Sequence, residues 1–427
     1  MKATLKFINK LKSAIIHSIA FYPILISTSF VFLAVILLFA ENLEAIATLK
    51  EVVPYLIVKE HDTASSILST IFSGILSLTV FSFTMVMVVL NQASSNFSPR
   101  LLPGLVSDKK HQIILGFYIG TLLYSIIVLM SLGTYGSSTN AIGFSVMMSA
   151  VFGVTCVVLF VYFIHSISQS IQIHNIINQI YYASNRLLEQ EIEEQQEAPN
   201  AIQNVSGDYT IIKCDRTGYY HSFDGTLLPD SFKKRSTTIE ILPYADQHIW
   251  MGTPIIRIKG TISEEDEKAI CLCLYILGNQ HEDDSSTGGM IKLSEVAVKA
   301  LSPGINDPGT AINAISKLGQ LLHRALQIKP TTQLEIPESN IKTIHNKIAP
   351  DEMMRIIVQP IRQYGKGDAS VAHTLMRTLI YICQSEAILP DYKWAIQAEI
   401  DALAYDVKQT ISNKNDAKKI LSLLESV

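Results

Sequence analysis

Hydroxyl and amide side chains recur along one apolar segment of the chain at steps of three, four and seven residues. Helical spacing of this kind places them along a single face of a helix. Such a face can bond to a neighbouring helix across a close contact, or it can line a water-filled path for an ion or a small solute. The residues concerned are Ser66, Thr70, Ser73, Ser77, Thr84 and Asn91.

A second group of chemically capable residues lies in the polar stretch NQHEDDSSTGG. His281, Asp283 and Asp284 bring an imidazole and two carboxylates together, and carboxylate oxygens are ligands for divalent cations. The ligand spacing of a calcium-binding loop is missing, and neighbouring residues cannot all point inward. A metal site is therefore the weaker hypothesis here, and a solvated loop is the competing interpretation.

The third group is the stretch ALSPGINDPGTAINAI at residues 300–315. Two prolines and two glycines so close together should end any helix, and Gly304 permits a reversal of the chain. Asn306 or Asp307 can then cap a new helix whose first residue is Pro308. We therefore expect a helix, a stiff turn and a second helix.

This corner is expected to span residues 290–327, in a packed helical layer. The same turn also supports a hypothesis of binding. Ser302, Asn306 and Asp307 present oxygen atoms at the start of a helix, where an aspartate disfavours an anion and suits a cation or the amides of a partner.

Four apolar segments surround the first group, and each is long enough to cross a bilayer, for which about 20 residues suffice. None of them contains Asp, Glu, Lys or Arg. A cleaved signal peptide is the competing interpretation of the first, but its apolar stretch exceeds the usual length of about 7–15 residues. The segments are residues 21–40, 67–90, 113–132 and 141–164.

Charge predicts the orientation of these segments. The first 165 residues carry nine Lys and Arg against six Asp and Glu, whereas the remainder carries 25 against 32. Basic residues gather before the first segment and between the second and third, so the positive-inside rule predicts that both termini lie in the cytoplasm. The basic residues before the first segment are Lys2, Lys6, Lys10 and Lys12.

Two polar residues are expected at the membrane boundary. Arg100 follows the second segment, where its guanidinium can bind a lipid phosphate or a carboxylate. His165 follows the fourth, where an imidazole can serve as a hydrogen-bonded boundary group or respond to pH.

The rest of the chain predicts a soluble α+β region. A stalk helix is expected over 166–197, a linker over 198–207 and a small antiparallel β-module over 208–262, from alternating strands such as YTIIKC and PIIRIKG. Residues 263–427 are expected to be helical, starting with a helix capped by Ser263 that carries CLCLYILG to about Gly278. The predicted fold is thus an all-α transmembrane domain (1–165) followed by a cytoplasmic α+β region.

Composition also sets limits on function. The five cysteines lack the pairing of a disulfide framework or a zinc site, so we expect buried free thiols in a reducing compartment. The sequence has no basic patch interleaved with aromatic residues, so nothing in it indicates nucleic acid binding. Because no nucleophile–base pair, phosphate loop or paired carboxylates stand out, no cofactor is expected and catalysis is disfavoured.

Several blocks of the chain resemble a widespread bacterial family of predicted membrane proteins with a domain of unknown function. They are LSEVAVKALSPGINDPGTAINAI, FSFTMVMVVLNQASSNFSPRLL, ILGFYIGTLLYSIIVL, RTGYYHSFD, IWMGTPI and PIRQYGKGDASV. The resemblance implies four spans and a cytoplasmic domain, and it supplies no reaction. The stretch QHEDDSSTGGMIKL departs from the family pattern, which weakens a ligand role for that loop.

Three functions follow as hypotheses. The first is an oligomeric channel or transport-like pore, formed by copies of the chain in the lipid bilayer, with a cytoplasmic gating and assembly domain. The alternative is a non-conducting membrane sensor or scaffold whose cytoplasmic domain binds a partner. An enzyme using His281, Asp283, Asp284 and Asp307 is the third and the least supported.

Overall fold

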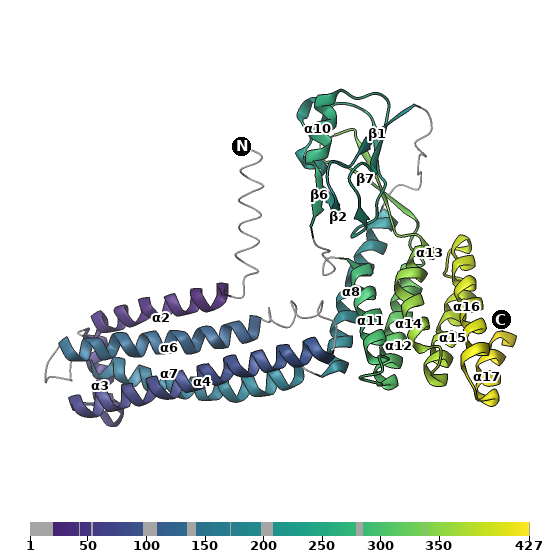
Figure 1. The fold of residues 1–427 in the computed structure, drawn as a ribbon. Coiled ribbons are helices and arrows are strands. Elements are labelled where there is room, and N and C mark those ends of the chain that lie inside the picture. Colours follow the sequence, from purple (N-terminus) through teal and green to yellow (C-terminus); the bar gives the residue numbers. More distant parts are fainter. Residues whose placement is uncertain are drawn as a thin grey trace. The chain divides into compact units, whose positions relative to one another are not determined.

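The computed structural model describes residues 20–41, 43–52, 54–96, 109–134, 142–170, 172–197, 208–278, 285–337 and 339–426. The described residues form two compact units, one up to Gln172 and one from Ile173 onward. Figure 1 shows the elements of both.

Four long helices make up the first unit, together with the short helices α3 (Glu44–Val52) and η1 (Pro54–Leu56). Each of the four is long and apolar enough to cross a membrane. They contain the four predicted segments, except that the fourth begins two residues later than expected. The long helices are α2 (Phe21–Ala40), α4 (His61–Asn96), α6 (Lys109–Thr134) and α7 (Gly143–Ser170).

Two glycines four residues apart allow α6 to approach α2 closely. A Cβ atom on Gly120 would lie 2.8 Å from the ring of Phe30, and one on Gly116 would lie 3.0 Å from Cα of Pro23. Small residues at this spacing are a common means of helix contact in membranes. This glycine pair is therefore used within the chain, against its own first long helix.

The second unit contains two sheets that enclose a core of isoleucines, with Tyr220 and Phe232. The larger sheet has the strand order β1-β5-β3-β8-β7, and the smaller one has the order β4-β2-β6. All pairs are antiparallel except β3 with β8. The strands are β1 (Tyr209–Lys213), β2 (Gly218–Phe223), β3 (Thr238–Ile241), β4 (His248–Ile249), β5 (Pro254–Lys259), β6 (Leu274–Leu277), β7 (Thr331–Glu335) and β8 (Lys342–Asn346).

Strands form at the five places expected within 208–262, although β4 shares only Ile249 with the expected IWMG, and the region after them is not purely helical. The helix that begins after the cap Ser263 ends at Leu272 as α10 (Glu264–Leu272), and the next residues form β6. The residues LYIL form a strand instead of continuing the helix because their backbone pairs with β2 and completes the smaller sheet. Strands β7 and β8 likewise join the larger sheet from the segment expected to be helical.

The helices of the second unit lie side by side in Figure 1. Helices α11 and α12 pack against each other, and both contact α8; α12 also contacts α15, which contacts α16. The helices are α8 (Ile173–Glu197), α9 (Asp230–Lys233), α11 (Ser286–Ala300), α12 (Pro308–Ala325), α13 (Pro350–Met353), a π-helical turn (Met354–Val358), α14 (Gln359–Gly365), α15 (Ala369–Gln384), α16 (Lys393–Thr410) and α17 (Lys414–Leu421). Single 3₁₀ turns occur at Gly225–Leu227, Pro390–Tyr392 and Ser422–Ser426.

The stalk helix expected over 166–197 is divided. Helix α7 ends at Ser170 in the first unit, and α8 begins at Ile173 in the second. Helix α8 packs tightly: a Cβ atom on Gly289 of α11 would overlap Oγ of Ser184. The segment after the last long helix is therefore part of the second unit's packed helical layer.

Candidate functional site

The polar residues of α4 lie on one outward face of the first unit. All six, from Ser66 to Asn91, are exposed. The opposite side of the helix is the packed one, where Ala64, Leu68 and Ile75 are buried. Among the residues that the structure describes, no helix of the chain packs on the polar face. It therefore does not serve packing inside the four-helix unit.

Hydroxyl groups on this face bond to the helix itself. The hydroxyls of Thr70 and Thr84 donate to the carbonyl oxygens of Ser66 and Val80, at 2.7 and 2.9 Å, and Ser77 donates to Ser73 at 3.0 Å. A hydroxyl that donates in this way keeps its acceptor lone pairs free. The face thus offers oxygen acceptors without a formal charge.

A second set of polar groups holds the interior of the first unit together. The hydroxyls of Ser125 and Ser149 lie 2.8 Å apart between α6 and α7, and the thiol of Cys156 lies 3.5 Å from the hydroxyl of Thr121. The hydroxyl of Tyr124 donates to the carbonyl of Ser145 at 3.0 Å. These bonds pair helices in the way that the sequence suggested for α4.

Glu41, directly after α2, is a structural residue that the sequence patterns do not identify. Its carboxylate is buried; one oxygen accepts from the backbone N–H of Ser145 at 2.7 Å, and the other lies 2.5 Å from Nζ of Lys50. A carboxylate near the N-terminus of a helix, here that of α7, interacts favourably with the helix dipole. The position of Glu41 directly after the apolar run of α2 is the sequence signal for this contact.

The boundary and metal predictions have different outcomes. His165 is exposed, and its ring nitrogen lies 3.2 Å from the amide of Gln169. Arg100, and the loop with His281, Asp283 and Asp284, lie outside the described residues. Among the residues that the structure describes, no group of three or more His, Cys, Asp or Glu could hold a metal ion.

The corner between α11 and α12 confirms the predicted helix stop and start. Oδ1 of Asp307 accepts from the backbone N–H of Thr310 at 3.0 Å, with Pro308 at the first helical position, and the Thr310 hydroxyl donates to Oδ2 at 2.6 Å. These bonds lower the pKa of Asp307. The reversal is made by Asn306, with φ of 49°, rather than by Gly304. The hydroxyl of Ser302 donates to Lys299.

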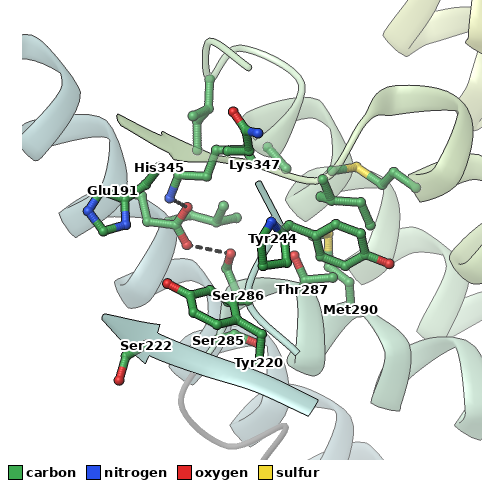
Figure 2. Close-up of a pocket in the computed structure, with 18 of the residues that line it drawn as sticks. Glu191, Tyr220, Ser222, Tyr244, Ser285, Ser286, Thr287, Met290, His345 and Lys347 are labelled. Atoms are coloured by element: carbon green, nitrogen blue, oxygen red, sulfur yellow. Dashed lines mark hydrogen bonds and ion pairs between the residues drawn. The ribbon is translucent and has the colours of Figure 1, made fainter. Parts of the chain in front are cut away.

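A cavity of about 230 Å³ lies within the second unit, where the sheets meet the helical layer. Figure 2 shows side chains converging on it from α8, β2, β8 and the start of α11. One part of its wall is apolar, with Leu188, Met290 and Leu326, and another part is polar. Its aromatic lining consists of Tyr220, Phe223, Tyr244 and Tyr392.

An ion pair and a helix start form the polar end of this cavity. The carboxylate of Glu191 on α8 accepts from the hydroxyl of Ser286 and lies 2.6 Å from Nζ of Lys347, as the dashed lines in Figure 2 show. Ser285 caps α11: its Oγ accepts from the N–H of Gly288 and donates to Asp246. Four segments that are distant in the sequence thus meet here.

Burial sets the protonation of the other lining groups. Desolvation, with the nearby charge of Lys347, lowers the pKa of His345 to about 4, so the imidazole is neutral at pH 7. Desolvation raises the pKa of Tyr244 and Tyr392 to about 12. Glu191 and Lys347 are the acidic and the basic residue of the wall. No local pattern in the sequence indicates this cavity, because its lining residues are spread from Leu188 to Tyr392.

The chain has four membrane-length helices followed by a separate α/β unit. No catalytic centre is evident among its described residues. The chain belongs to the family described as "Predicted membrane protein (DUF2254)", whose model matches residues 16–380. An uncharacterized protein of Mycobacterium tuberculosis and one of Mycobacterium bovis are similar to it, each 22% identical over 359 residues, which cover 79% of this chain and 67% of the relative. No solved structure matches.

Proposed function

We propose that copies of this chain assemble in the bacterial inner membrane with α4 around a central axis, so that its polar face lines a pore. The observation that carries the proposal is the position of six polar residues on a side of α4 that no other described residues cover, beside exposed apolar residues such as Val80 and Val88. Polar side chains facing lipid are costly, and a partner helix or water relieves that cost.

The chemistry of this face favours cations or neutral solutes over anions. The hydroxyls of Thr70, Ser77 and Thr84 donate to their own helix, so the oxygens that remain are acceptors. A pore lined by such oxygens stabilises a cation or a hydrogen-bond donor. No formal charge on the face is needed for passage, and none of the six residues carries one.

The orientation rests on the charges around the helices. With basic residues before α2 and between α4 and α6, both termini and the second unit are placed in the cytoplasm. The five free cysteines suit that reducing compartment. The second unit then acts as the gating and assembly domain.

Single cysteines on α4 test the pore. Ser77→Cys and Thr84→Cys, in a background with the native cysteines replaced by serine, are reconstituted in vesicles and treated with a charged methanethiosulfonate. We expect ion flux that falls on modification. Phe83→Cys is the matched control, because it is exposed but lies about 100° around the helix from Thr84. Equal sensitivity at 83 and 84, or no flux under voltage, tension or pH steps, contradicts a pore lined by this face.

A membrane sensor or scaffold is the second candidate, and the cavity in the second unit favours it. In that case the polar face of α4 serves contact between copies, and no solute passes. Cross-linking of Ser77→Cys between copies without any flux would support this candidate against the pore.

A further inference from the structure

We propose that a second cavity, which lies over α12, binds a nucleotide-like ligand, a phosphate ester that carries a flat aromatic ring. Its volume is about 840 Å³, which is in the range of small-molecule sites. Helix α12 lines its middle, and α8 and α15, which both contact α12, line its sides. We call it the α12 groove. All of its lining residues lie in the second unit, so ligand binding there does not depend on the proposed pore.

Arg377 gives the α12 groove a positive charge that no acidic residue of its described lining balances. The guanidinium of this arginine has no hydrogen-bond or ion-pair partner in the part of the chain that the structure describes. His373 and Tyr381 each lie one helical turn from Arg377 on α15, so the three side chains share one face of the helix. The ring nitrogens of His373 likewise have no partner among the described residues. An anionic group that enters the groove therefore meets an unpaired guanidinium, whereas a cation is repelled by it.

Arg324 is the second arginine of the lining, and only part of its donors are in use. Its Nη1 donates to Asn185, and to the carboxylate of Glu189 at 3.0 Å. The hydrogens of its Nε and Nη2 have no acceptor among the described residues. Because Glu189 balances the charge of Arg324, the preference for an anion rests on Arg377. Arg324 adds N–H donors in the planar arrangement that matches phosphate oxygens.

Tyr381 offers a ring face on which a second ring can stack. Its side chain is 65% exposed, and its ring contacts the imidazole of His323, with the ring centroids 5.5 Å apart. His323 is held in turn, because its Nε2 lies 2.9 Å from the hydroxyl of Ser385. An exposed aromatic ring on a fixed neighbour is a stacking surface for a flat base. A base on Tyr381 and a phosphate at Arg377, one turn away, are two parts of one ligand.

The remaining polar lining offers acceptors for the middle of such a ligand. The hydroxyls of Ser316, Thr374 and Thr378 donate to carbonyl oxygens of their own helices, at 2.8, 2.9 and 2.8 Å. Their oxygen lone pairs stay available to a donor. Sugar hydroxyls and the amino group of a base are such donors. An inorganic anion would use neither these acceptors nor the ring of Tyr381, so the lining favours the larger ligand.

Three probes separate the phosphate from the ring: adenosine 5′-monophosphate, adenosine and ribose 5-phosphate. Their binding to the full-length protein in detergent is measured by calorimetry and saturation-transfer NMR. We expect the monophosphate to bind about tenfold more tightly than either of the other two, because each lacks one of the two anchoring groups. Absence of binding by the monophosphate, or equal binding of the monophosphate and either of the other probes, would overturn the proposal.

Substitutions in the lining assign the two ends of the ligand. Arg377→Leu should weaken binding of the monophosphate about tenfold and leave that of adenosine unchanged. Tyr381→Leu should weaken the binding of both and leave that of ribose 5-phosphate unchanged. Gln320→Glu places a carboxylate in the lining and should weaken binding of the monophosphate, which keeps the charge testable if Arg377→Leu does not fold.

The matched control is Arg186→Leu, which removes an exposed arginine of α8 that does not line the α12 groove. It should leave binding of all three probes unchanged. An equal loss in Arg186→Leu and Arg377→Leu, or unchanged binding of the monophosphate in folded Arg377→Leu, would contradict the site. Melting curves of each variant separate lost binding from misfolding. Because no flux is measured, failure of the pore leaves the result intact.

Discussion

The corner at residues 301–310 and the cavity around Glu191 are both rich in polar residues, and they use them in opposite ways. In the corner, Ser302 and Asp307 bond to backbone or hydroxyl groups three residues away. In the cavity, Glu191 bonds to partners 95 and 156 positions away. Local bonds fix the direction of the chain, whereas distant ones join separate elements. Disrupting distant contacts should therefore cost more than disrupting local ones.

The largest effect is expected at the buried guanidinium of Arg362. It lies 2.6 Å from Glu399 and 2.5 Å from Asp406, which join α14 to α16. Arg362→Leu leaves the buried Glu399 without this partner and leaves Asp406 paired only with Lys366, at 3.6 Å, so we expect a loss of about 3–5 kcal/mol in unfolding free energy, measured by denaturant titration. Arg216→Leu breaks a local exposed pair with Asp215 and should cost less than about 1 kcal/mol. Similar losses of unfolding free energy for Arg362→Leu and Arg216→Leu would refute the distinction between distant and local contacts.

Gly289→Ala should destabilise the contact of α8 with α11 by about 2–3 kcal/mol, because its new methyl group overlaps Ser184. The double variant Gly289→Ala, Ser184→Gly lacks the overlapping side chain, so it should regain part of the lost unfolding free energy. Gly304→Ala is the control in the corner, where a Cβ atom meets nothing within 4 Å. A loss of unfolding free energy for Gly304→Ala as large as that for Gly289→Ala would contradict the expectation that the corner accommodates a Cβ atom.

Lowering the pH should destabilise the cavity, through His345, and the corner, through Asp307, in different pH ranges. Since the pKa of His345 falls to about 4 in the folded chain, the unfolded chain binds the proton first as pH falls. This histidine's contribution to stability is complete above its ordinary value near 6.5, and is lost between about 6.5 and 4. We expect a loss of about 2 kcal/mol between pH 7 and 5 in unfolding titrations. His345→Gln should abolish this dependence, and parallel curves for both proteins would contradict it.

The smallest effect is expected at Asp307. Asp307→Ala removes a helix cap and should cost about 1 kcal/mol in unfolding free energy, while Asp307→Asn keeps most of it. Because its pKa is lowered, the stabilisation is present above the ordinary value of 3.8 and is lost at more acidic pH. Loss of assembly or flux in Asp307→Ala at unchanged stability would instead indicate the binding role proposed for this turn.

The sequence predicted the parts of this molecule whose signals are local. The four apolar helices, the strands within 208–262 and the Asp307–Pro308 helix start were all found, because hydrophobic period and capping residues act over a few positions. The segment LYIL was misassigned because its strand depends on pairing with β2. The cavity could not be predicted, since nothing near Glu191 identifies Ser286 or Lys347 as its partners.

Strand β3 has another consequence, for the order in which the chain is made. Its parallel neighbour β8 pairs Thr238 with Lys342, so one edge of β3 stays open until the ribosome has released residues beyond Asn346. Open edges are prone to wrong pairing, and contacts between distant segments form slowly. A nascent chain stopped before β8 would expose that edge, whereas β1 and β5, fewer than 51 positions apart, can pair early. The second unit therefore completes its larger sheet late in synthesis, after the membrane-length helices have all emerged.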